Sequence, residues 1–63
     1  MKMIEFVRVL TNGENVITFE SSFKDGIEFW RVKEDGENHL MTFEGGQLYI
    51  DKLLDEGYWQ EVN

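Results

Sequence analysis

The sequence contains no cysteine, no proline and no alanine, and its single histidine is His39. Without cysteine the chain can form neither a disulfide nor a thiolate zinc site. One histidine cannot build a histidine-rich metal site, and we expect no cofactor. A chain of 63 residues buries only about 60% of its unfolded surface, so its core is marginal. The remaining sources of stability are dense aromatic packing, which the aromatic content of 14% favours, and a partner subunit.

Positive charge is also scarce, since 6 Lys and Arg stand against 13 Asp and Glu and give a net charge of −7. Binding nucleic acid through its phosphates requires Lys or Arg to replace counterions. We therefore expect no direct binding to nucleic acid or to an anionic membrane. The same acidic surface is attracted to basic protein surfaces, including the clefts of nucleic-acid-binding enzymes.

No apolar run is long enough for a signal sequence or a membrane span, because Glu5 and Arg8 interrupt the first ten residues. The hydrophobic fraction of 41% is nevertheless too high for a disordered chain. We expect one small domain over residues 1–63 and a cytoplasmic location.

Turn signals divide the chain into two predicted hairpins. Asn12-Gly13 and Asp35-Gly36 are flanked by alternating residues, and Asp25-Gly26 is a third candidate turn. These dipeptides favour tight hairpins because a type I′ turn needs positive φ at both central positions. The predicted pairs are residues 2–11 with 14–22 and residues 27–34 with 37–44.

In the first hairpin, a two-residue loop at 12–13 defines the register and the faces. It places Leu10 opposite Asn15, Arg8 opposite Ile17, Phe6 opposite Phe19 and Glu5 opposite Glu20. The better core face then carries Ile4, Phe6, Leu10, Ile17 and Phe19. Two opposed glutamates are unfavourable, so either a bulge shifts the register or these acids lie in open water.

The second hairpin has large apolar groups on both faces. A loop at 35–36 places Trp30 opposite Met41 and Val32 opposite His39, and we expect Trp30 in the core. Ile27, Phe29 and Leu40 fall on the other face, together with Arg31 and Lys33. The sheet is therefore either covered on both sides or left with an exposed apolar patch.

Residues 47–56 have apolar side chains at helical spacing and predict a C-terminal helix. Gly45-Gly46 is interpreted as the joint between strand and helix, and Gly57 suits the position just after the helix. Residues 58–62 form either a short last strand or an ordered tail. The predicted fold is α+β, with a small antiparallel sheet of about four strands packed against one helix.

The acidic charge is concentrated in one half of the chain. Residues 1–26 have four acids and three bases, whereas residues 27–63 have nine acids and three bases. Asp55 and Glu56 end the helix, where the macrodipole favours cations, and such violations of local rules are often functional. The alternative is an ordinary solubilising surface.

Two adjacent aromatics, Tyr58 and Trp59, complete the candidate surface. In an extended segment at most one of them points inward, and the other is a candidate contact of the kind enriched at interfaces. The predicted partner-binding residues are Glu34, Asp35, Glu37, Glu44, Asp51, Asp55, Glu56, Tyr58, Trp59 and Glu61.

Signals for catalysis are absent. Ser21-Ser22 lies outside any nucleophile motif, and no phosphate-binding glycine motif or calcium-loop spacing is present. We predict neither an enzyme nor a metal site.

In composition alone, the chain resembles the small acidic proteins that phages make to block host enzymes, some of which imitate DNA. That resemblance rests on no motif and transfers no residue roles. We predict a protein-interaction module that occludes a basic, nucleic-acid-handling partner, in its sharpest form a phage-type inhibitor or DNA mimic. The alternative is a structural domain that buries an apolar sheet face in a homodimer, with charge serving only solubility.

Overall fold

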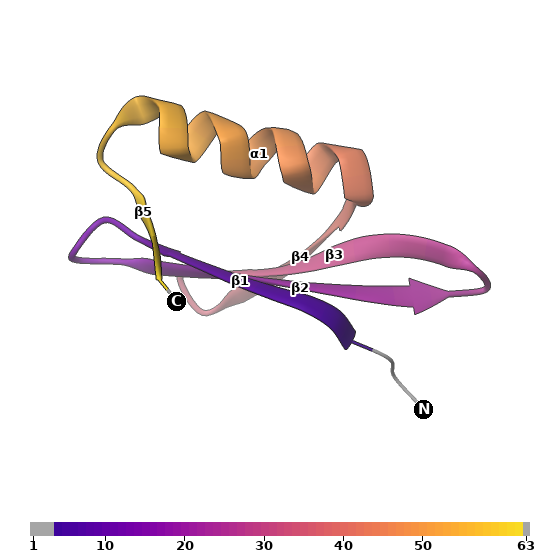
Figure 1. Cartoon of the computed structure of the whole chain (residues 1–63). Coiled ribbons are helices and arrows are strands. Elements are labelled where there is room, and N and C mark those ends of the chain that lie inside the picture. Colours follow the sequence, from indigo (N-terminus) through magenta and orange to yellow (C-terminus); the bar gives the residue numbers. More distant parts are fainter. Residues whose placement is uncertain (1–3, 63) are drawn as a thin grey trace.

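The computed structural model describes residues 4–62, with side chains from residue 6 onward. Its elements are β1 Ile4–Thr11, β2 Val16–Lys24, β3 Ile27–Glu34, β4 Glu37–Thr42, α1 Phe43–Glu56 and β5 Gln60–Val62. The strands form one antiparallel sheet in the order β4-β3-β2-β1-β5. Helix α1 crosses one face of this sheet and leads from one edge strand to the other (Figure 1). The α+β prediction is confirmed, and the predicted last strand is β5.

Two tight turns connect β2, β3 and β4. Asp25 and Gly26 join β2 to β3, and Asp35 and Gly36 join β3 to β4, all with positive φ. Both turns therefore have the backbone that the Asp-Gly pairs predict. The register of β3 on β4 is also as predicted, with Trp30 opposite Met41.

The predicted register of the first hairpin is wrong by two residues. Leu10 lies opposite Ile17 rather than Asn15, because the loop spans four residues instead of two. The Asn12 side-chain oxygen accepts hydrogen bonds from the backbone N–H groups of Glu14 and Asn15, at 2.9 and 2.7 Å, and closes the longer loop. A shift of two preserves the face of every residue, so Leu10 and Ile17 still point to the core.

The predicted pair Glu5–Glu20 is also wrong, because the four-residue loop places Val7 opposite Glu20. A bulge in β1 lies just beyond this pair. The register changes between Ile4, opposite Ser22, and Val7, opposite Glu20. At this point the Ser21 hydroxyl accepts a hydrogen bond from the backbone N–H of Phe6 at 2.8 Å. The longer loop, and not the bulge, therefore replaces the acid–acid pair by a valine–acid pair. Phe6, which lies at the bulge, is 52% exposed, so its predicted place in the core is wrong.

Helix α1 begins at Phe43 and not at residue 47, so Gly45-Gly46 is not a joint between elements. Thr42 caps the helix, and its hydroxyl accepts a hydrogen bond from the Gly45 N–H at 3.0 Å. Gly46 lies against the indole of Trp30, where a β-carbon would approach the ring to 2.0 Å. Both glycines therefore serve the first turns of the helix. At the other end, Gly57 takes the predicted left-handed conformation.

The core lies between α1 and the face of the sheet that it covers. Trp30 is its centre: the ring stacks on Phe43 at 5.3 Å and meets Phe19 edge-on at 6.1 Å. The indole N–H donates a hydrogen bond to the Phe43 carbonyl at 3.0 Å, so burial leaves no unpaired donor there. The buried apolar side chains are Leu10, Ile17, Phe19, Trp30, Val32, Ile50 and Leu53.

Candidate protein-binding surfaces

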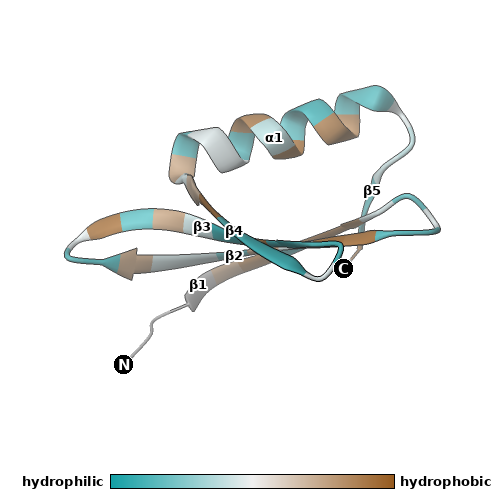
Figure 2. Ribbon diagram, turned by 180° about the vertical axis from the view of Figure 1, so that it is seen from behind, coloured by the Kyte–Doolittle hydropathy of each residue, from teal (hydrophilic) through white to brown (hydrophobic). Residues whose placement is uncertain are grey.

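The two faces of the sheet have different surroundings. One face of the sheet packs against α1, and this face together with α1 is called the helix side. The other face has no element over it in the described part of the chain (Figure 2). We call the second face the open face. Since side chains alternate along strands, the register assigns each residue to one face. The open face includes Thr11, Thr18, Ser22, Asn38, Thr42 and Gln60 as uncharged polar residues, and its apolar and charged residues are Val7, Val9, Val16, Glu20, Lys24, Ile27, Phe29, Arg31, Lys33, Leu40 and Val62.

Charge is sorted between these faces. Three cations, Lys24, Arg31 and Lys33, share the open face with Glu20. Each of the eight acids predicted to bind a partner lies elsewhere. They are in α1 (Glu44, Asp51, Asp55 and Glu56), in the β3–β4 turn (Asp35) or at strand positions on the helix side (Glu34, Glu37 and Glu61). The eight predicted acids therefore lie away from the open face, on the side of the molecule that also carries Arg8 and Lys52.

A first cluster of acids surrounds Tyr49. The Tyr49 hydroxyl donates to the carboxylate of Glu34 at 2.5 Å, so the helix and the end of β3 are tied together. Burial, this hydrogen bond and the negative charges of Glu34, Glu56 and Asp35 raise the pKa of Tyr49 to about 12. Three of the predicted acids thus contribute to the raised pKa of the same residue, Tyr49. The sequence assigned Tyr49 only to the apolar side of the helix.

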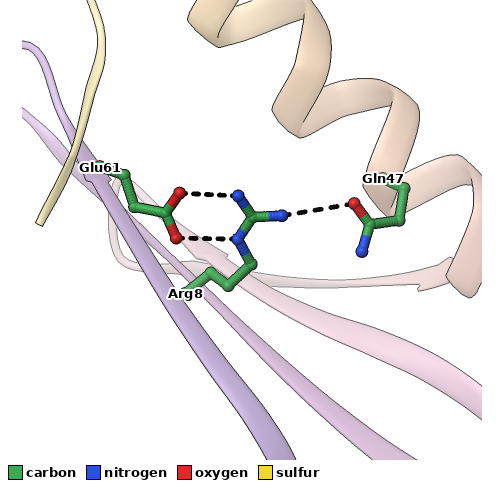
Figure 3. Close-up of polar contacts among 3 residues, drawn as sticks. All are labelled: Arg8, Gln47 and Glu61. Carbon is green, nitrogen blue, oxygen red and sulfur yellow. Dashed lines mark hydrogen bonds and ion pairs between the residues drawn. The ribbon is translucent and has the colours of Figure 1, made fainter. Parts of the chain in front are cut away.

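A second cluster is centred on Arg8, at the β5 side of the helix. The Arg8 guanidinium donates two hydrogen bonds to Glu61, at 2.6 and 2.8 Å, and one to the side chain of Gln47 at 3.4 Å (Figure 3). The bond to Arg8 lowers the pKa of Glu61, and the same bond raises the pKa of Arg8. Asp51 also contributes negative charge there. Glu61 is therefore compensated within the chain and offers less charge to a partner.

Arg8 is a residue that the candidate list omitted. Its position in β1 alternates with Leu10, so a cation stands on the side of the strand that faces the core. A charged group at such a position requires a partner, since burial without one is costly. That requirement is the signal in the sequence that could have predicted the bond to Glu61.

The remaining acids of α1 sit at its two ends. Glu44 is in the first turn, where negative charge stabilises the helix macrodipole. Asp55 and Glu56 are exposed in the last turn, which contains no basic residue. Their charge is thus opposed by the local dipole and remains available at the surface.

Tyr58 and Trp59 take opposite roles. Trp59 packs against the core, whereas Tyr58 is 76% exposed. The prediction that at most one of them points inward is confirmed. Tyr58 is therefore the aromatic side chain that a partner can reach, next to the acidic last turn of α1.

The open face has a different chemical character. Ile27 and Leu40 are about 70% exposed, and with Phe29, Lys24 and Asp25 they line a shallow apolar hollow of about 330 Å³. Of the two alternatives for the second hairpin, the exposed apolar patch is therefore the correct one. Exposed apolar patches of this kind mark sites of association on small proteins.

Between residues 4 and 62 no group of three or more His, Asp or Glu side chains is placed to hold a metal ion. The helix in that range is too short and too polar to cross a membrane. Comparison with protein-family models, with curated proteins and with solved structures gave no match.

Proposed function

We propose that this protein is a protein-binding module without catalytic activity, which acts in the cytoplasm. Its acidic helix side docks onto a basic surface of a protein that handles nucleic acid. The docked module occupies that surface and thereby keeps nucleic acid away from it.

The observation that carries this proposal is the sorting of charge in the fold. The predicted acids lie on the helix, in the β3–β4 turn and on the helix side of the sheet, while Lys24, Arg31 and Lys33 lie on the open face. A one-sided field orients a charged molecule as it approaches an oppositely charged partner, which raises the association rate. A surface that served only solubility would need no such separation of signs.

The mechanism follows from the chemistry of the two groups involved. Carboxylates such as Asp55 and Glu56 compete with phosphates for the Lys and Arg side chains of the partner. Tyr58 supplies contact area that excludes water beside them. In the sharpest form of the proposal, the acids replace phosphates of bound DNA, as in a phage-type DNA mimic.

The test is retention of proteins from a bacterial lysate on the immobilised chain, eluted along a salt gradient. We expect basic nucleic-acid-handling proteins to elute late from the wild type and to be lost from the Asp55→Lys, Glu56→Lys double variant. The matched control reverses two acids in loops away from the helix, Glu14 and Asp25, and has the same net charge.

The control decides what the retention means. A partner that stays on the loop variant and leaves the helix variant identifies the helix side as the binding surface. Equal loss from both variants would show that net charge alone retains these proteins, and the proposal would then be wrong. Retention that does not weaken with salt would contradict it as well.

A further inference from the structure

We propose that the open face is the interface of a homodimer, in which two copies pack sheet against sheet and present their acidic helix sides outward. The inference rests on the open face and not on the acids, so it is independent of the proposed docking to a basic partner. It identifies the occupant of the exposed apolar surface as a second copy of this chain.

Burial is the first argument. Seven apolar side chains lie on the open face: Val7, Val9, Val16, Ile27, Phe29, Leu40 and Val62. Leu40 and Ile27, at about 70% exposure, border the hollow and are free to enter a facing surface. A sheet with alternating side chains normally turns its polar side to water, so a second apolar side indicates a second layer.

The size of the face fits a dimer. Five strands about 4.8 Å apart, with roughly 20 to 25 Å of paired length, give a face of about 500 to 600 Å². Two such faces bury roughly 1,000 to 1,200 Å² in total, which reaches the lower end of specific interfaces. Because the same patch meets itself, the contact closes as a two-fold dimer and leaves no further site for growth.

The charges of the open face disfavour a basic partner, and they include an acid with which a second copy can pair. A basic protein is repelled by Lys24, Arg31 and Lys33 on the open face and is attracted instead to the helix side. A second copy presents Glu20 among its own cations, where Lys33 Nζ is 4.0 Å from the Glu20 carboxylate. Facing copies can therefore exchange this pairing, with Glu20 of each near the cations of the other.

The same arrangement separates the acidic surfaces. Packed sheets lie about 10 Å apart and each helix layer adds about 10 Å, so the two helix sides stand roughly 30 Å apart. That distance is several times the Debye length of about 8 Å at physiological ionic strength. Association through the helix sides would instead bring the acids together.

Leu40 and Leu48 provide a matched test of the interface. Both are leucines with 70% exposure, but Leu40 is on the open face and Leu48 is on the helix. Sedimentation equilibrium of the wild type, from micromolar to millimolar concentration, is expected to show a dimer of twice the 7.5 kDa chain mass. Leu40→Lys should raise its dissociation constant about tenfold or more, whereas Leu48→Lys should leave it unchanged.

Ile27→Lys is a second variant of the open face and should weaken the dimer in the same way as Leu40→Lys. Both positions are exposed and lie outside the core, and circular dichroism shows whether each variant is folded. We expect salt to change the dimer affinity little, because the acidic helix sides of the two copies lie several Debye lengths apart. A wild type that stays monomeric at millimolar concentration would overturn the inference. Equal weakening by the Leu40 and Leu48 variants would overturn it too, since it indicates head-to-tail stacking of helix side on open face.

The outcome is separable from that of the docking proposal. Basic partners are expected to bind the Leu40→Lys monomer through its helix side, with an affinity that falls with salt. Self-association is expected to change little with salt and to depend on Leu40. Each behaviour can therefore fail while the other holds.

Discussion

The helix side and the open face of the sheet are built from alternate residues of the same strands, yet they differ in how deeply their side chains are buried. In β2 and β3, Phe19, Trp30 and Val32 point to α1 and are almost fully buried. Their neighbours Ile27, Phe29 and Arg31 point away from α1 and remain partly or largely exposed. One face therefore holds the fold together, and the other remains accessible to water.

This difference shows how a small chain without disulfides distributes its apolar side chains between the two faces of its sheet. The helix covers the side with the largest aromatic cluster, where Trp30 meets Phe19 and Phe43. Apolar groups on the other side gain little from folding of a single chain, because water still reaches them. They contribute fully only when another surface covers them.

The largest expected effect comes from truncating the same residue type on each face. Phe19→Ala removes a ring with no exposure from the core and is expected to cost about 3 to 5 kcal/mol of unfolding free energy. Phe29→Ala, on the open face, is expected to cost about 1 kcal/mol at concentrations where the chain is monomeric. Chemical denaturation followed by circular dichroism measures both. Similar losses at the two positions would contradict the division between the faces.

A smaller effect is expected from the contact that joins the helix to the sheet. Gly46→Ala places a β-carbon in the Trp30 ring and is expected to cost about 2 to 3 kcal/mol. Gly45→Ala is the matched control, because its β-carbon meets only the Thr42 hydroxyl, and the gain in helix propensity of about 1 kcal/mol offsets part of a weakened cap. Thermal unfolding of both variants compares them. A Gly45 variant as unstable as the Gly46 variant would show that the cap, and not the ring contact, fixes the helix.

The smallest expected effect concerns the bond between Tyr49 and Glu34. The pKa of Tyr49 is raised from 10.0 to about 12, so its contribution to stability is complete below pH 10 and is lost as the pH rises through 12. Tyr49→Phe should cost about 1 kcal/mol at neutral pH and should remove that alkaline loss. Ultraviolet titration of a Tyr58→Phe variant, in which Tyr49 is the remaining tyrosine, reads the ionisation directly. An ionisation of Tyr49 at pH 10 would show that the bond to Glu34 does not hold in solution.

The parts of the fold that depend on local chemistry could be predicted from the sequence. The Asp-Gly pairs at 25–26 and 35–36 need positive φ wherever they stand, and both turns form as expected. The two-residue loop predicted at Asn12-Gly13 is wrong because the Asn12 side chain closes a longer loop, in which it accepts hydrogen bonds from the backbone N–H groups of Glu14 and Asn15. The faces of Leu10, Ile17 and Phe19 were still assigned correctly, since a register error of two leaves the alternation unchanged. Phe6 was not, because the bulge in β1 leaves it 52% exposed.

The parts that depend on distant contacts could not be predicted in this way. The start of α1 depends on Gly46, which is required by an indole 16 residues earlier in the chain. Arg8 and Glu61 are 53 residues apart, and Tyr49 and Glu34 are 15 apart, so no local spacing indicates either bond. Net charge located the acidic half of the chain, but only the register showed that three cations, Lys24, Arg31 and Lys33, share the opposite face.

The most direct test of the central claim, that the two faces serve different contacts, is a methyl NMR spectrum recorded while the protein is diluted and then while a basic oligolysine peptide is added. Dilution is expected to shift the methyl signals of Leu40, Ile27 and Val9, and the peptide is expected to shift those of Leu48 and Leu54. Methyl signals that respond to both treatments alike, or a response of Leu48 to dilution and of Leu40 to the peptide, would contradict the account.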